Sequence, residues 1–354
     1  MKDKLTQRER FFTALDLQKS DKVPTFDFLY SPVIWEKILG IEPKYTAKEQ
    51  LAAALILGLD SVSVPTRPAS NYKFAMKNGI YKDEWGGTMK KDPASWPLDA
   101  PIKFIIKDRN DLKNLNRLDP DRTERYEEQA EVVSLNKGRV ALGGTVSGPL
   151  TYAWIYHGAE RLLMNFYDDP KFLGEMFKIF NDFAVPYAVN QVRVGLDYMW
   201  LAEDLGCSSG PFFSNKMFKE LLYPFLLEIV TELRKEKKDL KIAVHCCGDF
   251  KIFIEDIINL GVDAIHPFQR TAGWDIAQVK QKYGDRIAII GNIDSSRTLP
   301  YGTVEDVKKE VKETIEAAGQ NGGLVIAADH SLHDGIPIEN MLAIYEAVEE
   351  FGYY

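Results

Sequence analysis

The stretch KIAVHCCGDF, Lys241 to Phe250, brings an imidazole and two thiols to the end of a short apolar run, at His245, Cys246 and Cys247. The run is too short for a helix and is typical of a buried strand that ends in a turn. Side chains alternate between the faces of a strand, so His245 and Cys247 should point to one side and Cys246 to the other. This pair predicts half of a zinc site. The alternative is a buried histidine beside two small apolar cysteines.

The composition is that of an ordinary globular protein, with 45% hydrophobic and 27% charged residues. A net charge of -8 and a pI near 5.4 argue against a nucleic-acid partner and an anionic membrane surface, because both favour a basic face. The N-terminal residues lack an apolar signal core, and no apolar run approaches the roughly 20 residues that cross a bilayer. We therefore expect a cytoplasmic chain. With three cysteines, two of them adjacent, a metal or catalytic role is favoured over a disulfide framework.

Eight short apolar runs alternate with longer amphipathic segments. Segments such as VEDVKKEVKETIEAAG have apolar residues at spacings of three and four, which predicts helices. Strand and helix alternating eight times predict an α/β fold, a (β/α)8 TIM barrel, with residues 1-354 as a single domain. The expected strands are Val23 to Phe28, Ser61 to Thr66, Val140 to Thr145, Tyr198 to Glu203, Ile242 to Cys247, Ala264 to Phe268, Ile287 to Ile293 and Leu324 to Asp329.

Three similar triplets support this count: Gly58-Leu59-Asp60, Gly195-Leu196-Asp197 and Gly261-Val262-Asp263. Each comes just before an expected strand, where a glycine can adopt the left-handed conformation that closes the preceding helix. The interval 68-139 is longer than one helix requires. We interpret it as an insertion after the second strand, a hairpin and a helical cover over the barrel mouth.

The active site of such a barrel lies at the carboxyl ends of its strands. Four of the five histidines fall at or just beyond the expected ends, and this concentration favours a metal over the buried-histidine alternative. The polar side chains at these ends are Asp27, Tyr30, Arg67, Ser147, Glu203, Asp204, His245, Cys247, His266, Gln269, Asn292, Asp294, Asp329 and His330.

Several of these residues have a purely structural alternative. His266 precedes a proline, and its alternative role is simply to hold the end of a strand. The alternative role of Asn292 is to cap a turn. Arg67 could bind a substrate carboxylate or pair with a neighbouring acid. Adjacent residues diverge in a strand, so only one of Glu203 and Asp204 should face the barrel axis. The predicted substrate-binding residues are Asp27, Tyr30, Arg67, His266 and Asn292.

Six stretches carry a more specific pattern: TQRERFFTALDLQKSDKVP, GPLTYAW, AEDLGCSSGPFFSNKMFKELLYPF, VHCCGD, GNIDSSRTLPYGTVEDV and ADHSLHDGIPIENMLAIYEAV. Together they resemble the uroporphyrinogen decarboxylase superfamily over nearly the whole chain. The chain looks closest to its corrinoid-linked methyltransferases, whose His-x-Cys zinc pair on the fifth strand matches His245 and Cys247. Those relatives take another ligand from the last strand, often a cysteine followed by glycine, where this sequence has His330 and Ser331. The resemblance implies a zinc site of His245, Cys247 and His330, with Glu203 as a further candidate ligand.

The resemblance also implies an activity. The expected enzyme moves a methyl group from a small donor, a methoxylated aromatic, to the Co(I) corrinoid of a separate, transiently bound protein, as the first methyltransferase of an O-demethylation system. One thiolate and two neutral imidazoles leave Zn2+ a formal charge of about +1, which favours activation of a leaving oxygen. Glu203, Asp204 or Asp329 would stabilise or protonate that oxygen.

Other readings remain open at this point. The true decarboxylases carry arginines near the first strand for their many substrate carboxylates, whereas this region reads FDFLYSPVIW and has none. Decarboxylation of uroporphyrinogen is therefore the second alternative, and a noncatalytic protein that carries a corrinoid or tetrapyrrole is the third. Methylated amines and tetrahydrofolate are further candidate substrates. The terminal pair Tyr353-Tyr354 is a candidate interface for a homodimer.

Overall fold

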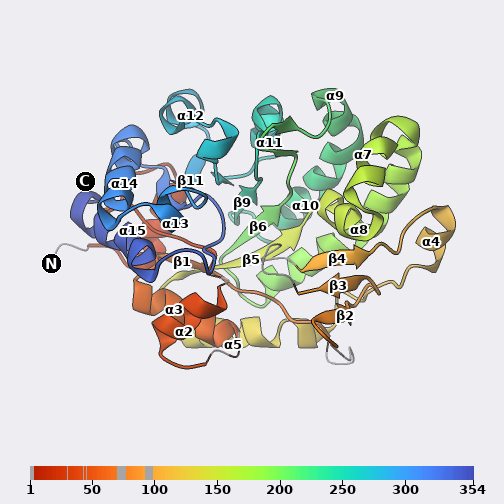
Figure 1. Cartoon of the computed structure of the whole chain (residues 1–354), viewed down its shortest axis with the longest axis horizontal. Coiled ribbons are helices and arrows are strands. Elements are labelled where there is room, and N and C mark those ends of the chain that lie inside the picture. The colour runs from red at the N-terminus through yellow and green to blue at the C-terminus, as the bar shows by residue number, and fades with distance from the viewer. Residues whose placement is uncertain (1–3, 30, 43, 45, 70–76, 92–98) are drawn as a thin grey trace.

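Seven parallel strands form a curved sheet at the centre of the molecule (Figure 1). The structure is a computed structural model that describes residues 4–29, 31–42, 44, 46–69, 77–91 and 99–354. The sheet order is β1-β5-β6-β9-β10-β11-β12. These strands are β1 (Ser61–Ser63), β5 (Ala141–Ser147), β6 (Tyr198–Ala202), β9 (Lys241–His245), β10 (Ala264–His266), β11 (Ala288–Ile293) and β12 (Leu324–Ala328).

The segment 23–29 lies where the first strand was expected, between the two ends of this sheet. Phe26 N–H donates to the carbonyl of Ile326 in β12, and Asp60 N–H, just before β1, donates to the carbonyl of Thr25. Thr25 and Leu29 form isolated parallel bridges with Ile326 of β12 and with Leu332, which follows that strand. The prediction of an α/β fold is confirmed, and the arrangement is consistent with a TIM-like barrel.

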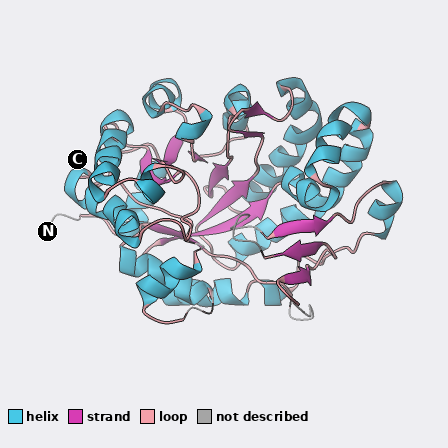
Figure 2. Cartoon of the chain, viewed as in Figure 1, coloured by secondary structure: helices cyan, strands magenta, loops and turns pink. Residues whose placement is uncertain are grey.

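Helices cover the outside of this sheet (Figure 2). Strands β11 and β12 are buried along their whole length, as expected for a parallel sheet with covered faces. The helices are α1 (Gln7–Leu15), α2 (Pro32–Leu39), α3 (Ala47–Leu57), α4 (Arg109–Asn114), α5 (Glu127–Asn136), α6 (Pro149–His157), α7 (Ala159–Asp168), α8 (Pro170–Arg193), α9 (Asn215–Met217), α10 (Tyr223–Glu236), α11 (Ile254–Asn259), α12 (Ile276–Tyr283), α13 (Thr298–Tyr301), α14 (Val304–Ala318) and α15 (Ile338–Phe351). In the described part of the chain, none of them is long and apolar enough to span a bilayer.

The interior of the barrel is filled by side chains of complementary size. Large rings of Phe26, Tyr198 and Trp200 pack with small residues such as Ala243 and Ala288 in one buried cluster. A separate and larger apolar cluster lies between the sheet and the helices. Because of this filling, the interior is a core rather than a channel.

The Gly-x-Asp triplets hold the starts of the strands. Gly58, Gly195 and Gly261 have positive φ angles of 73°, 104° and 85°, as the sequence predicted. Each aspartate then accepts a hydrogen bond from a backbone N–H of the neighbouring strand or segment. The pairs are Asp60 with Thr25 (2.8 Å), Asp197 with Leu142 (3.0 Å) and Asp263 with Ile242 (2.8 Å). The role of the glycines was predicted from the sequence, whereas the hydrogen bonds of the aspartates were not.

The described residues of the interval 68-139 form two structural parts. The first includes an antiparallel sheet of β2 (Ile80–Lys82), β3 (Thr88–Lys90) and β4 (Ala100–Lys103), followed by α4. Trp85 anchors this part to α6 and α8 through ring contacts with Tyr152 and Phe180. The second part is α5, which packs beside α3 and belongs to the helix layer of the barrel. A short hairpin, β7 (Gly206–Cys207) and β8 (Gly210–Pro211), follows β6.

The C-terminal tyrosines pack against the same chain. Tyr353 bridges to Lys22, and Tyr354 N–H donates to the carbonyl of Asp21. These contacts fix the two tyrosines within the chain, and the homodimer stays a prediction.

Replacing Asp60 by alanine should destabilise the barrel strongly. Arg10 is 3% exposed and donates to Asp60 at 2.6 Å, so the change leaves a buried guanidinium with one partner fewer and removes the acceptor for Thr25 N–H. We expect the free energy of unfolding in urea to fall by about 3–5 kcal/mol. The matched control is Asp182→Ala, which breaks an exposed ion pair to Lys178 and should change it by about 0.5 kcal/mol or less. Equal effects of the two changes would contradict the structural role of Asp60.

Candidate metal centre

Three potential metal ligands converge at the carboxyl ends of β9 and β12. His245 ends β9, Cys247 follows it by two residues, and His330 lies two residues beyond β12. Their ligand atoms all lie within 4.8 Å of one another, with His245 Nε2 3.2 Å from Cys247 Sγ. Zn–N and Zn–S bonds of about 2.0–2.3 Å place tetrahedral ligands roughly 3.5 Å apart, so small side-chain rotations would let this group hold one ion. The side chain of Cys246 is instead buried in the apolar cluster between the sheet and the helices.

The environment of Cys247 also suits a cation. Burial raises the pKa of its thiol well above the usual value, and the nearby carboxylate of Asp204 raises that pKa further. Asp204 accepts a hydrogen bond from the backbone N–H of Cys247 at 2.7 Å, which fixes the carboxylate beside the thiol. A thiolate is therefore unfavourable here unless a metal compensates its charge.

His266 of β10 lies beside His245 of β9, on the side of that ring away from Cys247. Its Nδ1 is 2.7 Å from Nδ1 of His245, and its Nε2 is 3.1 Å from the carbonyl oxygen of Ala328. Burial lowers the pKa of His245 to about 4 and the pKa of His266 well below its usual value. Both imidazoles are thus kept neutral, which is the form that binds metals.

The ligand group borders a cavity of about 190 Å³ at the barrel mouth. Phe28 and Trp200 form an aromatic wall, and Thr145, Ser147 and Thr151 add hydroxyl groups. The remaining lining residues are Ala202, Glu203, Asp204, His245, His330 and Ser331. The sequence reading missed Trp200 and Thr151. Period-two alternation along β6 places Trp200 on the same face as Ala202, so that signal was available.

Glu203 lines this cavity, but its carboxyl oxygens are hydrogen-bonded to the first turn of α6. Its two carboxylate oxygens accept hydrogen bonds from Leu150 N–H (2.8 Å), Thr151 N–H (3.0 Å) and the Thr151 hydroxyl (2.6 Å) at the start of α6. Burial raises the pKa of Glu203 to about 8. Gly148 is required beside it, because an added Cβ would lie 2.5 Å from the carboxyl group. Glu203 caps α6 and stands outside the three-ligand group.

Asp329 and Asn292 lie near the centre but do not line the cavity. One oxygen of Asp329 accepts hydrogen bonds from the N–H and hydroxyl of Ser295, while Oδ2 is buried without a hydrogen-bond partner. Burial raises the pKa of Asp329 to about 6. Asn292 donates to the carbonyl of Phe268 at 2.8 Å. Both residues position the loops around the ligand group.

Three further predicted substrate-binding residues, His266, Arg67 and Asp27, do not line this cavity. His266 is 1% exposed and contacts protein atoms through both ring nitrogens. Arg67 forms an ion pair with Glu128 of α5 at 2.9 Å, which was the structural alternative. Tyr30 lies outside the described residues. Asp27 points away from the mouth, because it alternates with the inward-facing Phe26 and Phe28.

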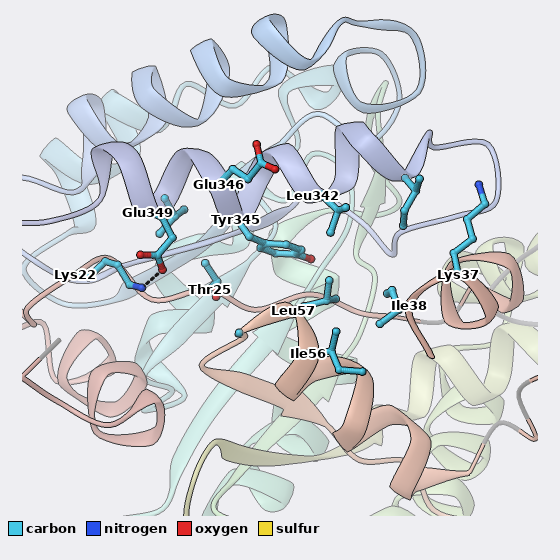
Figure 3. A pocket seen from close by; sticks show the side chains of 13 residues that line it. Lys22, Thr25, Lys37, Ile38, Ile56, Leu57, Leu342, Tyr345, Glu346 and Glu349 are labelled. Atoms are coloured by element: carbon cyan, nitrogen blue, oxygen red, sulfur yellow. Dashed lines mark hydrogen bonds and ion pairs between the residues drawn. The ribbon is translucent and has the colours of Figure 1, made fainter. Parts of the chain in front are cut away.

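Asp27 instead joins the first segment to β12 and α15. Its carboxyl group accepts from Ala328 N–H and from the Tyr345 hydroxyl, each at 2.8 Å. Figure 3 shows Tyr345 lining a second cavity of about 440 Å³ between α2, α3 and α15. Although larger, that cavity is lined by none of the predicted site residues that the structure describes, and we place the candidate chemistry at the smaller one.

Fold and site together define a class: a barrel-type α/β protein with a group of candidate metal ligands at the carboxyl ends of its strands. Residues 100–351 match the model of the family described as Uroporphyrinogen decarboxylase (URO-D). The chain belongs to this family, which confirms the resemblance seen in the sequence.

Individual relatives are more distant. A uroporphyrinogen decarboxylase of Psychromonas ingrahamii is 25% identical over 310 residues, 84% of this chain and 79% of that protein. One from Coxiella burnetii is 26% identical over 187 residues, and this match spans only 49% of that protein. The solved structure of a methyltransferase from Methanosarcina mazei aligns over 98% of this chain and 99% of its own, with 20% identity and a TM-score of 0.75. At that identity the likeness shows a shared fold.

The buried Asp27 should make stability fall as the pH rises. Burial raises the pKa of Asp27 to about 7, whereas in the unfolded chain it is about 3.9. Between these values the folded state binds more protons than the unfolded state, so the free energy of unfolding decreases from pH 4 to pH 7. Asp27→Asn removes this dependence. Measured by urea unfolding, the stability of the variant relative to wild type should rise by on the order of 3 kcal/mol over that range. Parallel pH curves for the two proteins would contradict the assignment.

Proposed function

We propose that this protein is a zinc-dependent methyltransferase that moves a methyl group from a small methoxylated donor to the Co(I) corrinoid of a separate protein. The observation that carries the proposal is the group of His245, Cys247 and His330 at the edge of a small, aromatic-walled cavity. Membership of the URO-D family and the shared fold with a methyltransferase support it.

The ligand set favours activation of the donor. With one thiolate from Cys247 and two neutral imidazoles, a bound Zn2+ would keep a charge of about +1 and supply a Lewis acid for the ether oxygen of the donor. Phe28 and Trp200 offer apolar ring surface to hold an aromatic donor and exclude water. The methyl group would leave without the electrons of its C–O bond, which stay on the oxygen. The electron pair of the new bond would come from Co(I), which becomes Co(III).

Asp204 is the residue best placed to handle the proton of the departing oxygen. Of the three predicted acids, Glu203 is engaged at α6, and Asp329 does not line the cavity. Asp204 lines it and is fixed beside Cys247. Its carboxylate would relay a proton from solvent to the oxygen as the methyl group leaves.

Uroporphyrinogen decarboxylation is the second candidate, which the names of the relatives favour. The cavity argues against it, because the described residues that line it include no lysine or arginine to match a substrate with many carboxylates. The same volume of about 190 Å³ suits one small ring better than a tetrapyrrole.

Metal content and methyl transfer test the proposal directly. We expect one zinc per purified chain, and loss of both zinc and methylation of a reduced corrinoid protein in His245→Ala and Cys247→Ala, by at least about 100-fold in rate. Cys207→Ser, at an exposed cysteine outside the ligand group, is the control and should retain both.

Several outcomes would reject the proposed activity. These are a folded wild type without metal, release of carbon dioxide from uroporphyrinogen, or stoichiometric binding of a corrinoid without methyl transfer from any donor in a panel of methoxyaromatics and methylamines.

The third ligand can be identified by a second pair of variants. His330→Ala should weaken zinc binding by at least about 10-fold, because it removes a ligand. Glu203→Gln should keep one zinc per chain but lower the free energy of unfolding by about 1–3 kcal/mol, because an amide oxygen replaces two capping oxygens. Zinc loss in Glu203→Gln with retention in His330→Ala would reverse the assignment.

A further inference from the structure

We infer that His266 is a positioning residue that fixes His245 in the tautomer whose Nε2 is free to bind a metal. The inference rests on the metal role proposed above, and it concerns a residue outside the ligand group. Its basis is a chain of contacts from the carbonyl of Ala328 through His266 and His245 to Cys247.

The direction of each hydrogen bond in this chain follows from its first member. The oxygen of Ala328 can only accept, so Nε2 of His266 must carry a hydrogen at this 3.1 Å contact. In a neutral imidazole the other nitrogen then has a lone pair. Nδ1 of His266 therefore accepts, and Nδ1 of His245 donates across the 2.7 Å contact. The Nε2 lone pair of His245 is left facing Cys247 Sγ at 3.2 Å.

The two imidazoles are held in this relation by packing. Their planes differ by 26° and their centroids are 4.9 Å apart, while the Nδ1 atoms are only 2.7 Å apart, so the rings meet edge to edge. Phe28 and Trp200 contact His266 through T-shaped ring pairs with centroids 5.6 and 5.7 Å away. His266 is 1% exposed, so water cannot readily replace either partner.

The identity of His266 as the hydrogen-bond acceptor of His245 has a chemical consequence. Histidine ligands commonly donate their second N–H to a carboxylate or carbonyl, and a carboxylate raises the basicity of the ligand. Here the acceptor is a neutral imidazole, which orients His245 without adding negative charge behind the metal. The arrangement therefore preserves the electron-poor centre that activation of a donor oxygen requires.

Two substitutions separate the two contacts of His266. The side-chain oxygen of asparagine takes the place of Nδ1, so His266→Asn keeps an acceptor for His245 and loses the contact with Ala328. The amide nitrogen of glutamine takes the place of Nε2, so His266→Gln keeps the donor to Ala328 and loses the acceptor at His245. Zinc affinity, measured by competition with a chelator, should stay within about 3-fold in His266→Asn and fall by about 10- to 100-fold in His266→Gln.

A measurement on the metal-free wild type keeps the inference testable if either variant fails to fold. Nitrogen-15 spectra of histidine-labelled protein near neutral pH should show His245 with hydrogen on Nδ1 and His266 with hydrogen on Nε2. Hydrogen on Nε2 of His245, or equal zinc affinities in the two folded variants, would overturn the inference. Neither readout requires a methyl donor, so failure of the proposed activity alone would leave these results unchanged.

Discussion

The pairing register of β6, β9 and β10 fixes the position of the candidate metal centre. Ala202, His245 and His266 form one row across these strands. A shift of one residue would turn His245 from the mouth to the helix layer, because side chains alternate along a strand. Asp263 opposes such a shift by binding the backbone of Ile242 at the start of β9. The chemistry at one end of the sheet thus depends on a carboxylate at the other.

Much of this arrangement could be predicted from the sequence, because it follows from local periodicity. Alternation places His245 and Cys247 together, and the count of strands brings His330 to the same rim as these two residues. The side-chain partners could not be predicted, because they come from distant segments. Asp27 meets Tyr345 of α15, and Glu203 meets the first turn of α6. Both acids appeared as site residues in the sequence only because they are polar and close to strand ends.

Burial favours the uncharged forms of Glu203, Cys247 and His245 at this site. The pKa of Glu203 is raised to about 8, that of the Cys247 thiol is raised well above its usual value, and that of His245 is lowered to about 4. A cation that binds at the ligand group changes this balance, because a thiol must lose its proton to become a ligand. Metal binding by this group, as proposed, would therefore be linked to proton release.

The filled interior of the barrel determines how molecules can meet at the mouth. Packed rings of Phe26 and Trp200 close the path from below. A small compound and a macromolecule that both use the cavity must therefore arrive from the same side, and the larger one covers the opening. Under the proposed methyl transfer the smaller would have to bind first and leave last, so the packing of aromatic side chains beneath the site would appear in steady-state kinetics as a compulsory order of addition.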